Sequence, residues 1–95
     1  MIKVVAKNII KKDKIEEALE HIKELVAITV KEEGCIKYEI YQDEKDISIL
    51  TMIEEWESKE ALNKHMASEH FKRIVPIIGG FAEKAGEINL YKKII

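Results

Sequence analysis

Apolar and polar residues follow one another along the chain in a pattern that predicts four β-strands. Residues 2–10 and 35–42 alternate in part between apolar and polar side chains, residues 47–56 begin with an almost continuous apolar run, and residues 88–95 form the last apolar segment. Alternation is typical of a strand with one buried face. The polar turn at 43–46 is short enough to join the second and third strands into a hairpin.

Apolar residues recur at three- and four-residue spacing in two further parts of the chain, which is typical of amphipathic helices. The first part runs through residues 15–29, and Gly34 ends it as the residue that accepts a left-handed conformation. The second part begins after Ser58, a good helix cap, starts again at Ser68 and contains Pro76, which should disrupt or bend the helix.

The order of these elements is strand–helix–strand–strand–helix–strand. It predicts one α+β domain over residues 1–95, with the ferredoxin-like βαββαβ arrangement and an antiparallel sheet. We expect Gly79-Gly80 to break the second helical part, and an irregular piece to precede the last strand at 88–95.

The third strand is apolar on both faces, and this favours a dimer. Ile49 and Ile53 point to one side, while Leu50 and Met52 point to the other. Helices of the same chain can cover one face, but 95 residues are too few to cover the second. A second copy of the chain is the simplest cover, so we expect a homodimer.

Composition narrows the class of protein. The chain holds 16 basic and 18 acidic residues, so it lacks the basic excess that nucleic-acid binding requires. Its single cysteine, Cys35, excludes an intramolecular disulfide, and no apolar run approaches the roughly 20 residues of a membrane span. The apolar strip in residues 1–7 is interrupted by lysines, unlike a signal peptide. We therefore expect a cytoplasmic protein that binds neither nucleic acid nor membrane.

Three histidines are the first candidates for chemistry. His21 lies among glutamates of the first helix and is expected to be solvated. His65 lies on the inward-leaning side of the second helical part, where it is either a packed core histidine or a general acid/base. His70 follows the cap Ser68 and could face solvent or line a pocket mouth. A spacing of five residues places His65 and His70 poorly for one helical face, so we expect no metal site.

Three other residues could share a pocket with His65. Glu54 has the parity of the inward residues of its strand, and it lies either in solvent at the sheet end or in a pocket against His65. Trp56 is a core or interface anchor. Asn8 could place an amide in the same cavity, or simply end the first strand. These patterns indicate a possible pocket, but not a reaction.

The spaced motifs of the chain resemble the antibiotic biosynthesis monooxygenase (ABM) domain family over essentially its whole length. They are Gly34-Cys35, Glu54-Glu55-Trp56-Glu57-Ser58, Ala61-Leu62-x-x-His65 and Ser68-Glu69-His70-Phe71. Within the family, Val30–Cys35 and Met52–Ser58 are most similar to the quinol monooxygenases.

This resemblance implies a dimeric α/β barrel formed sheet to sheet. It also implies an oxidoreductase that oxidises a small, quinol-like aromatic substrate with O₂, without metal, flavin or another cofactor. A base would remove a phenolic proton, and the resulting carbanion-like substrate would reduce O₂ in a dry pocket. On this view His65 and Glu54 are catalytic, while Asn8, Trp56 and His70 bind the substrate.

Two alternatives remain open. An isomerase of a small phosphorylated dicarbonyl, of the type that processes autoinducer-2, has the same architecture and matches this chain at Glu54, His65 and His70, but it has no tryptophan at the position of Trp56. A non-enzymatic dimeric binding or stress module is the other. Oxygen uptake with a quinol would distinguish the monooxygenase from the isomerase and from the binding or stress module.

Overall fold

The computed structural model describes all 95 residues. Four strands, three α-helices and a short 3₁₀ turn (Lys12–Lys14) follow one another along the chain. In order, the strands and α-helices are β1 (Ile2–Ile10), α1 (Ile15–Thr29), β2 (Cys35–Gln42), β3 (Ile49–Trp56), α2 (Lys59–Met66), α3 (Glu69–Gly80) and β4 (Ala82–Lys92).

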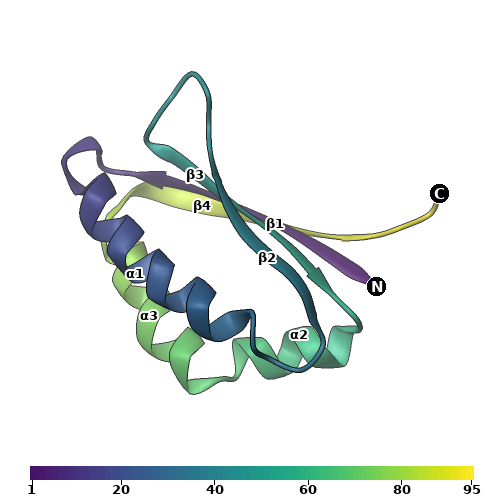
Figure 1. Ribbon diagram of the computed structural model, residues 1–95. Coiled ribbons are helices and arrows are strands. Elements are labelled where there is room, and N and C mark those ends of the chain that lie inside the picture. Colours follow the sequence, from purple (N-terminus) through teal and green to yellow (C-terminus); the bar gives the residue numbers. More distant parts are fainter.

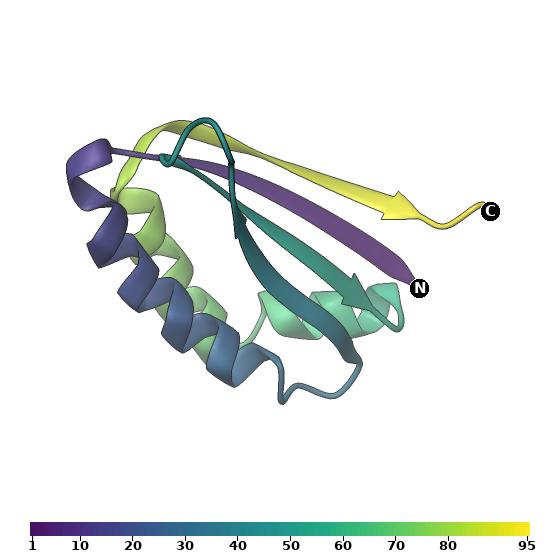
Figure 2. The same ribbon diagram turned by 45° about the horizontal axis from the view of Figure 1, so that its top comes forward.

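The strands form one sheet in the order β2-β3-β1-β4, and every neighbouring pair is antiparallel. All three α-helices lie on the same side of this sheet, with α1 and α3 side by side (Figures 1 and 2). The expected ferredoxin-like βαββαβ fold with an antiparallel sheet is therefore confirmed. No helix is long and apolar enough to cross a membrane.

The core lies between the sheet and the helices, and the alternation in the sequence decides which side chains enter it. Even-numbered residues of β1 and β3 face the helices, and odd-numbered residues face away. The buried residues of this layer include Val4, Ala6, Ile10, Leu50, Met52 and Trp56 from the sheet and Ala18, Ile22, Leu25, Leu62, Ile74 and Ile78 from the helices.

In the C-terminal third, helix α3 ends at the break expected from Gly79-Gly80, but the predicted start of the last strand was wrong. Helix α3 continues through Pro76, because the buried residues Ile74 and Ile78 on either side of the exposed proline hold it against the core. Strand β4 begins at Ala82, six residues before the expected start at Ile88, because its first residues pair with β1 through their backbone although most of their side chains are exposed. Hydrophobic pattern carries no signal for such an edge segment.

Gly86 explains how β4 joins β1. The pairing of the two strands is irregular after Lys7, and a Cβ at Gly86 would lie only 2.4 Å from the carbonyl oxygen of Lys7. A side chain would push the strands apart at this point, so the close approach requires glycine.

The face of the sheet opposite the helices is left without cover by the chain itself (Figure 2). Two cross-strand pairs on it are apolar, Val5 with Ile53 and Ile9 with Ile49. On the helix-facing side of β4, Ile88 is 70% exposed, because no helix packs extensively against this edge strand.

Candidate functional site

His65, a residue of α2, points into the protein and packs against Trp56 at the end of β3. It is 1% exposed. Its ring is surrounded by three aromatic rings, which we call the aromatic enclosure: Trp56 at 4.6 Å between ring centroids, Phe71 at 5.1 Å and Tyr38 at 5.4 Å. Burial lowers the pKa of His65, and the hydrogen bond and negative charge of Glu32 oppose this effect. The neutral imidazole is therefore favoured.

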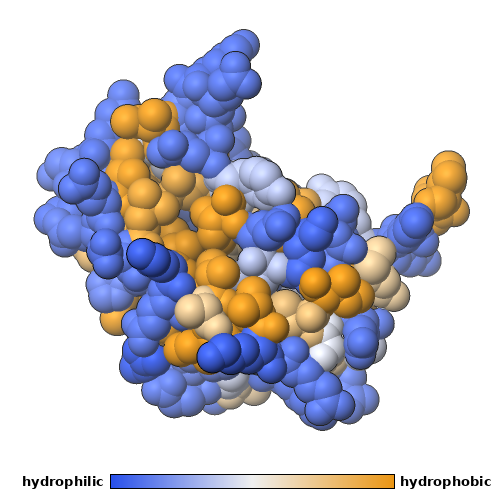
Figure 3. All heavy atoms as spheres, viewed as in Figure 1, coloured by the Kyte–Doolittle hydropathy of each residue, from blue (hydrophilic) through white to orange (hydrophobic).

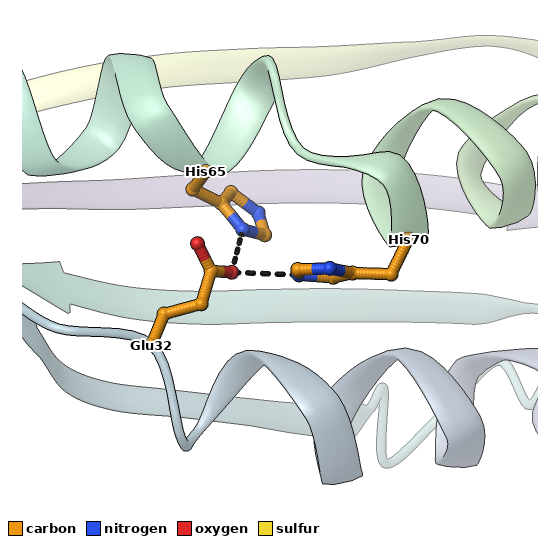
Figure 4. Close-up of side chains that lie close together, drawn as sticks. All are labelled: Glu32, His65 and His70. Carbon is orange, nitrogen blue, oxygen red and sulfur yellow. Dashed lines mark hydrogen bonds and ion pairs between the residues drawn. The ribbon is translucent and has the colours of Figure 1, made fainter.

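Glu32 joins His65 to His70 (Figure 4). Oxygen Oε2 of Glu32 lies 2.6 Å from Nδ1 of His65 and 2.8 Å from Nε2 of His70. The three side chains come from three separate segments: the connection after α1, the helix α2 and the start of α3. We call this group the Glu32–His65–His70 triad. The exposed fraction of the side chain rises from 2% for His65 to 13% for His70 and 17% for Glu32.

Two local features of the sequence bring the triad together. Gly34 has φ +86°, and a Cβ there would lie 2.5 Å from that of Ala61, so glycine lets the connection that carries Glu32 pass close to α2. Ser68 separates α2 from α3: its Oγ donates to the carbonyl of His65 at 2.6 Å and caps α3 by accepting from the backbone N–H of Phe71. This turn lets two histidines five residues apart point to one carboxylate.

Glu54 is a second buried carboxyl group, but it has another partner. It is 5% exposed, and its Oε1 accepts a hydrogen bond of 3.0 Å from Nε1 of Trp56. Burial raises the pKa of Glu54 to about 7; the hydrogen bond from Trp56 opposes the rise, and the negative charge of Glu32 adds to it. The group therefore exchanges its proton near neutral pH.

Burial also keeps two neighbours in their neutral forms. It raises the pKa of Cys35 to about 11, with contributions from Glu32 and Glu54. It raises the pKa of Tyr38 well above the usual value for a phenol, and the Tyr38 hydroxyl donates to the sulfur of Met52 at 3.4 Å. Cys35 is thus a thiol at neutral pH, which disfavours a nucleophilic role.

The structure brings together four of the five residues selected from the sequence: His65, His70, Glu54 and Trp56. Asn8 lies elsewhere. It pairs with Leu50, four residues before Glu54 on β3, and its side-chain amide donates to the backbone carbonyls of Ala6 and Leu50.

Sequence reasoning missed Glu32, which lies in the polar run Lys31-Glu32-Glu33 and has no periodic signal. The family resemblance of Val30–Cys35, which contains Glu32, indicated that this connection matters but did not single out the residue.

The triad consists of residue types that bind transition metals, and its three ligand atoms lie within 4.8 Å of one another. The five-residue spacing of the two histidines did not predict this arrangement, because they lie on different helices. However, ligands held at about 2.1 Å from one tetrahedral ion lie more than about 3 Å apart. The separations of 2.6 and 2.8 Å are those of hydrogen bonds, so an ion would have to spread the triad.

Two hollows of the surface approach the site from different sides. An apolar groove of about 550 Å³, which we call the α1 groove, lies between α1 and β2 and is visible as a hydrophobic band in Figure 3; it is lined by Leu19, Ile22, Lys23, Val26, Ala27 and Ile40. Its residue Ile40 lies two positions after Tyr38 on the inner face of β2. A smaller hollow of about 290 Å³ is lined by Glu32 itself, together with Ser58, Ala61 and Lys64 among others.

An antiparallel sheet covered by helices on one face, with a buried histidine at its end, makes this chain a ferredoxin-like domain with a candidate active site. The chain belongs to the antibiotic biosynthesis monooxygenase family, whose model matches residues 1–76.

Solved structures support this membership. A conserved protein from Methanosarcina mazei Go1 is 45% identical with a TM-score of 0.96, over 98% of this chain and 92% of that one. A crystal structure of an antibiotic biosynthesis monooxygenase is 37% identical with a TM-score of 0.96 over 100% of both chains. A possible oxidoreductase from Bacteroides thetaiotaomicron is 30% identical with a TM-score of 0.88, over 95% and 94% of the two chains.

The chain is also similar to a longer protein. An uncharacterized protein from Synechocystis is 33% identical over 90 residues, which make up 94% of this chain. The chain spans only 61% of that relative's length.

Proposed function

We propose that this protein is a cofactor-independent monooxygenase that oxidises a small quinol-like aromatic compound with O₂. The observation that carries the proposal is a buried imidazole with one free nitrogen. Nδ1 of His65 is held by Glu32, whereas Nε2 makes no hydrogen bond within the chain, and the ring as a whole lies in the aromatic enclosure. A neutral imidazole in a dry, aromatic environment is suited to take a proton from a phenol.

The reaction can be written with all atoms assigned. His65 accepts the phenolic proton, and the electron-rich ring carbon of the phenolate transfers electrons to O₂ and forms a C–O bond. The peroxide oxygen takes a proton from His65 and yields a hydroperoxide. Loss of the C–H proton and the terminal hydroxyl as water leaves a carbonyl. One oxygen atom of O₂ remains in the quinone product and the other leaves in water.

The neighbours of His65 have separate parts in this proposal. Trp56 packs against the imidazole, with the two ring centroids 4.6 Å apart, and keeps its surroundings apolar. Glu54, whose pKa is about 7, can protonate a developing oxyanion or take up a proton. We propose the α1 groove as the entrance for the substrate, because its apolar lining suits an aromatic ring and its residue Ile40 lies two positions after Tyr38 of the aromatic enclosure. Asn8, with its amide engaged by backbone carbonyls, is left out of the proposed site.

We also propose that the protein acts as a homodimer. The open face of the sheet carries the apolar pairs Val5–Ile53 and Ile9–Ile49, and a second copy would remove them from water. Sedimentation of the wild-type protein at micromolar concentration should give a dimer, and Ile53→Asp should give a monomer. A wild-type monomer under these conditions would contradict the proposal.

An isomerase of a small phosphorylated dicarbonyl is the second candidate, and one observation favours it. Glu54 and His65 are two buried groups whose pKa values are moved by their surroundings, and such pairs perform acid/base chemistry without O₂. This reaction differs from the first in needing no oxidant.

The test is oxygen consumption against a panel of quinols, beginning with menadiol, using protein treated with a chelator and free of flavin. We expect protein-dependent O₂ uptake above the rate of autoxidation, and one ¹⁸O atom from ¹⁸O₂ in the quinone. Turnover of a dicarbonyl under nitrogen, with no O₂ uptake in the panel, would support the isomerase instead. Tight binding of an aromatic compound without any turnover would leave only a binding module.

A further inference from the structure

The Glu32–His65–His70 triad defines where the protons of its histidines reside. An ionised carboxylate only accepts hydrogen bonds, so a nitrogen that contacts Oε2 of Glu32 must carry a hydrogen. Both contacts, 2.6 Å from Nδ1 of His65 and 2.8 Å from Nε2 of His70, reach the same oxygen. Two N–H donors therefore converge on one acceptor, and neutral His65 keeps its lone pair on Nε2.

The arrangement is held from several sides. The hydroxyl of Ser68 donates a hydrogen bond to the carbonyl of His65, and the Oγ of Ser68 lies 3.2 Å from Nε2 of His70. Glu32 is carried by the connection that Gly34 allows to approach α2. His70 occupies the second lone pair of Oε2, which restricts the rotation of the carboxylate. The ring of His65 consequently has one orientation and one tautomer available to it.

We propose that Glu32 and His70 are positioning residues that fix His65 as its Nδ1–H tautomer, so that Nε2 is the basic atom of the site. The proposal rests on the proposed function only for the use made of that atom; the tautomer itself is a property of the resting protein. In free histidine the proton of the neutral ring resides mainly on Nε2. The triad reverses this preference and leaves the lone pair on Nε2, the nitrogen that Glu32 does not contact.

The protein offers a direct test because it contains only three histidines. Long-range ¹H–¹⁵N spectra of the ¹⁵N-labelled wild-type protein at pH 7.5 distinguish protonated from unprotonated ring nitrogens, and His21 serves as the internal reference. We expect His65 to be protonated at Nδ1 and bare at Nε2. A wild-type His65 that is protonated at Nε2 would overturn the proposal without any variant.

Substitutions then assign the cause. Glu32→Ala should move His65 towards the Nε2–H tautomer, and His70→Ala should produce a smaller movement in the same direction. Glu33→Ala, at the adjacent glutamate, is the matched control and should leave the spectrum of His65 unchanged. If His65 remains entirely in the Nδ1–H form in folded Glu32→Ala protein, Glu32 does not position it. An unchanged spectrum in His70→Ala would remove His70 from the role.

The kinetic consequence separates this proposal from the proposed function. If the protein oxidises a quinol, Glu32→Ala should lower kcat about 10- to 100-fold with little change in KM, because a partner that orients a reacting imidazole acts mainly on the chemical step. Equal kcat values for Glu32→Ala and wild type would contradict the positioning role. Absence of quinol oxidation in the wild-type protein, with the Nδ1–H tautomer present, would contradict the reaction and leave the positioning intact.

Discussion

Two carboxyl groups lie near His65: Glu54 at the end of the sheet and Glu32 on the side of the helices. Their surroundings differ. Glu54, on β3, is 5% exposed and receives one hydrogen bond, from Trp56. Glu32, on the connection between α1 and β2, lines a surface hollow and lies against two histidines. The first environment favours a protonated acid, whereas the second holds a carboxylate between hydrogen-bond donors.

A shared sequence pattern therefore does not identify the residue that contacts His65. Glu54 shares the strand and parity of Trp56, but Glu32 contacts His65. The two regions also respond to pH in opposite directions. A raised pKa of Glu54 costs stability as pH rises, whereas a lowered pKa of His65 costs stability as pH falls below its usual value of 6.5.

The largest effect on the free energy of unfolding should come from ionisation of Glu54. Its pKa is about 7 in the folded protein, whereas an unperturbed glutamate has a pKa of 4.5, so between these values the folded state binds more protons than the unfolded chain. The free energy of unfolding should therefore fall as pH rises from about 4.5 through 7, by roughly 3 kcal/mol at 1.4 kcal/mol per pKa unit. Urea titrations at pH 5 and pH 8.5 should show that the free energy of unfolding falls less between these two pH values in Glu54→Gln than in wild type. Equal slopes would show that Glu54 does not ionise in this range.

A smaller effect should follow removal of the partner of Glu54. Trp56→Phe retains most of the aromatic surface but removes the Nε1–H donor, and leaves a buried carboxyl group without its hydrogen bond. We expect a loss of about 1–3 kcal/mol in the free energy of unfolding, larger at pH 8.5 than at pH 5, because the ionised group needs the donor more. In the Glu54→Gln background the pH dependence of this loss should disappear.

The turn at Ser68, between α2 and α3, should contribute less to the free energy of unfolding than the hydrogen bond between Trp56 and Glu54. Ser68→Ala removes the cap of α3 and the hydrogen bond to the carbonyl of His65. Loss of an N-cap costs about 1 kcal/mol, which thermal or urea unfolding can detect. Ser68→Thr retains the hydroxyl and is the matched control; a loss as large as that of the alanine variant would mean that the hydroxyl is not the cause.

The smallest effect should be found on the opposite face of β3. Glu55 follows Glu54 in the chain but points away from the helices, where its carboxylate lies 3.6 Å from Lys37 and 3.9 Å from Lys3. Glu55→Gln should change the free energy of unfolding by less than about 1 kcal/mol, because both of its lysine partners are exposed and ion pairs at a protein surface contribute little. It should not alter the pH response attributed to Glu54. A change as large as that of Glu54→Gln would remove the distinction between the two faces.

The sequence predicts the fold better than the site, for physical reasons. Alternation in β1 and β3 and the helical period of α1 reflect burial, so Val4, Leu50 and Leu25 could be placed in the core in advance. The start of β4 could not be placed, because an edge strand pairs through its backbone. Glu32 could not be found either, since its role depends on a left-handed turn at Gly34 and on two helices that meet at Ser68. Such contacts between distant segments leave no periodic signal in the chain.

Oxygen consumption by wild-type protein and by variants of His65 tests the central claim most directly. With menadiol or another quinol from the panel, wild-type protein should consume O₂, and His65→Ala and the bulkier His65→Gln should lower the rate about 10²- to 10⁴-fold, the usual contribution of a general base. His21→Ala should react like wild type. Rates within a factor of about two of wild type for folded variants of His65 would contradict the assignment of this residue as the base.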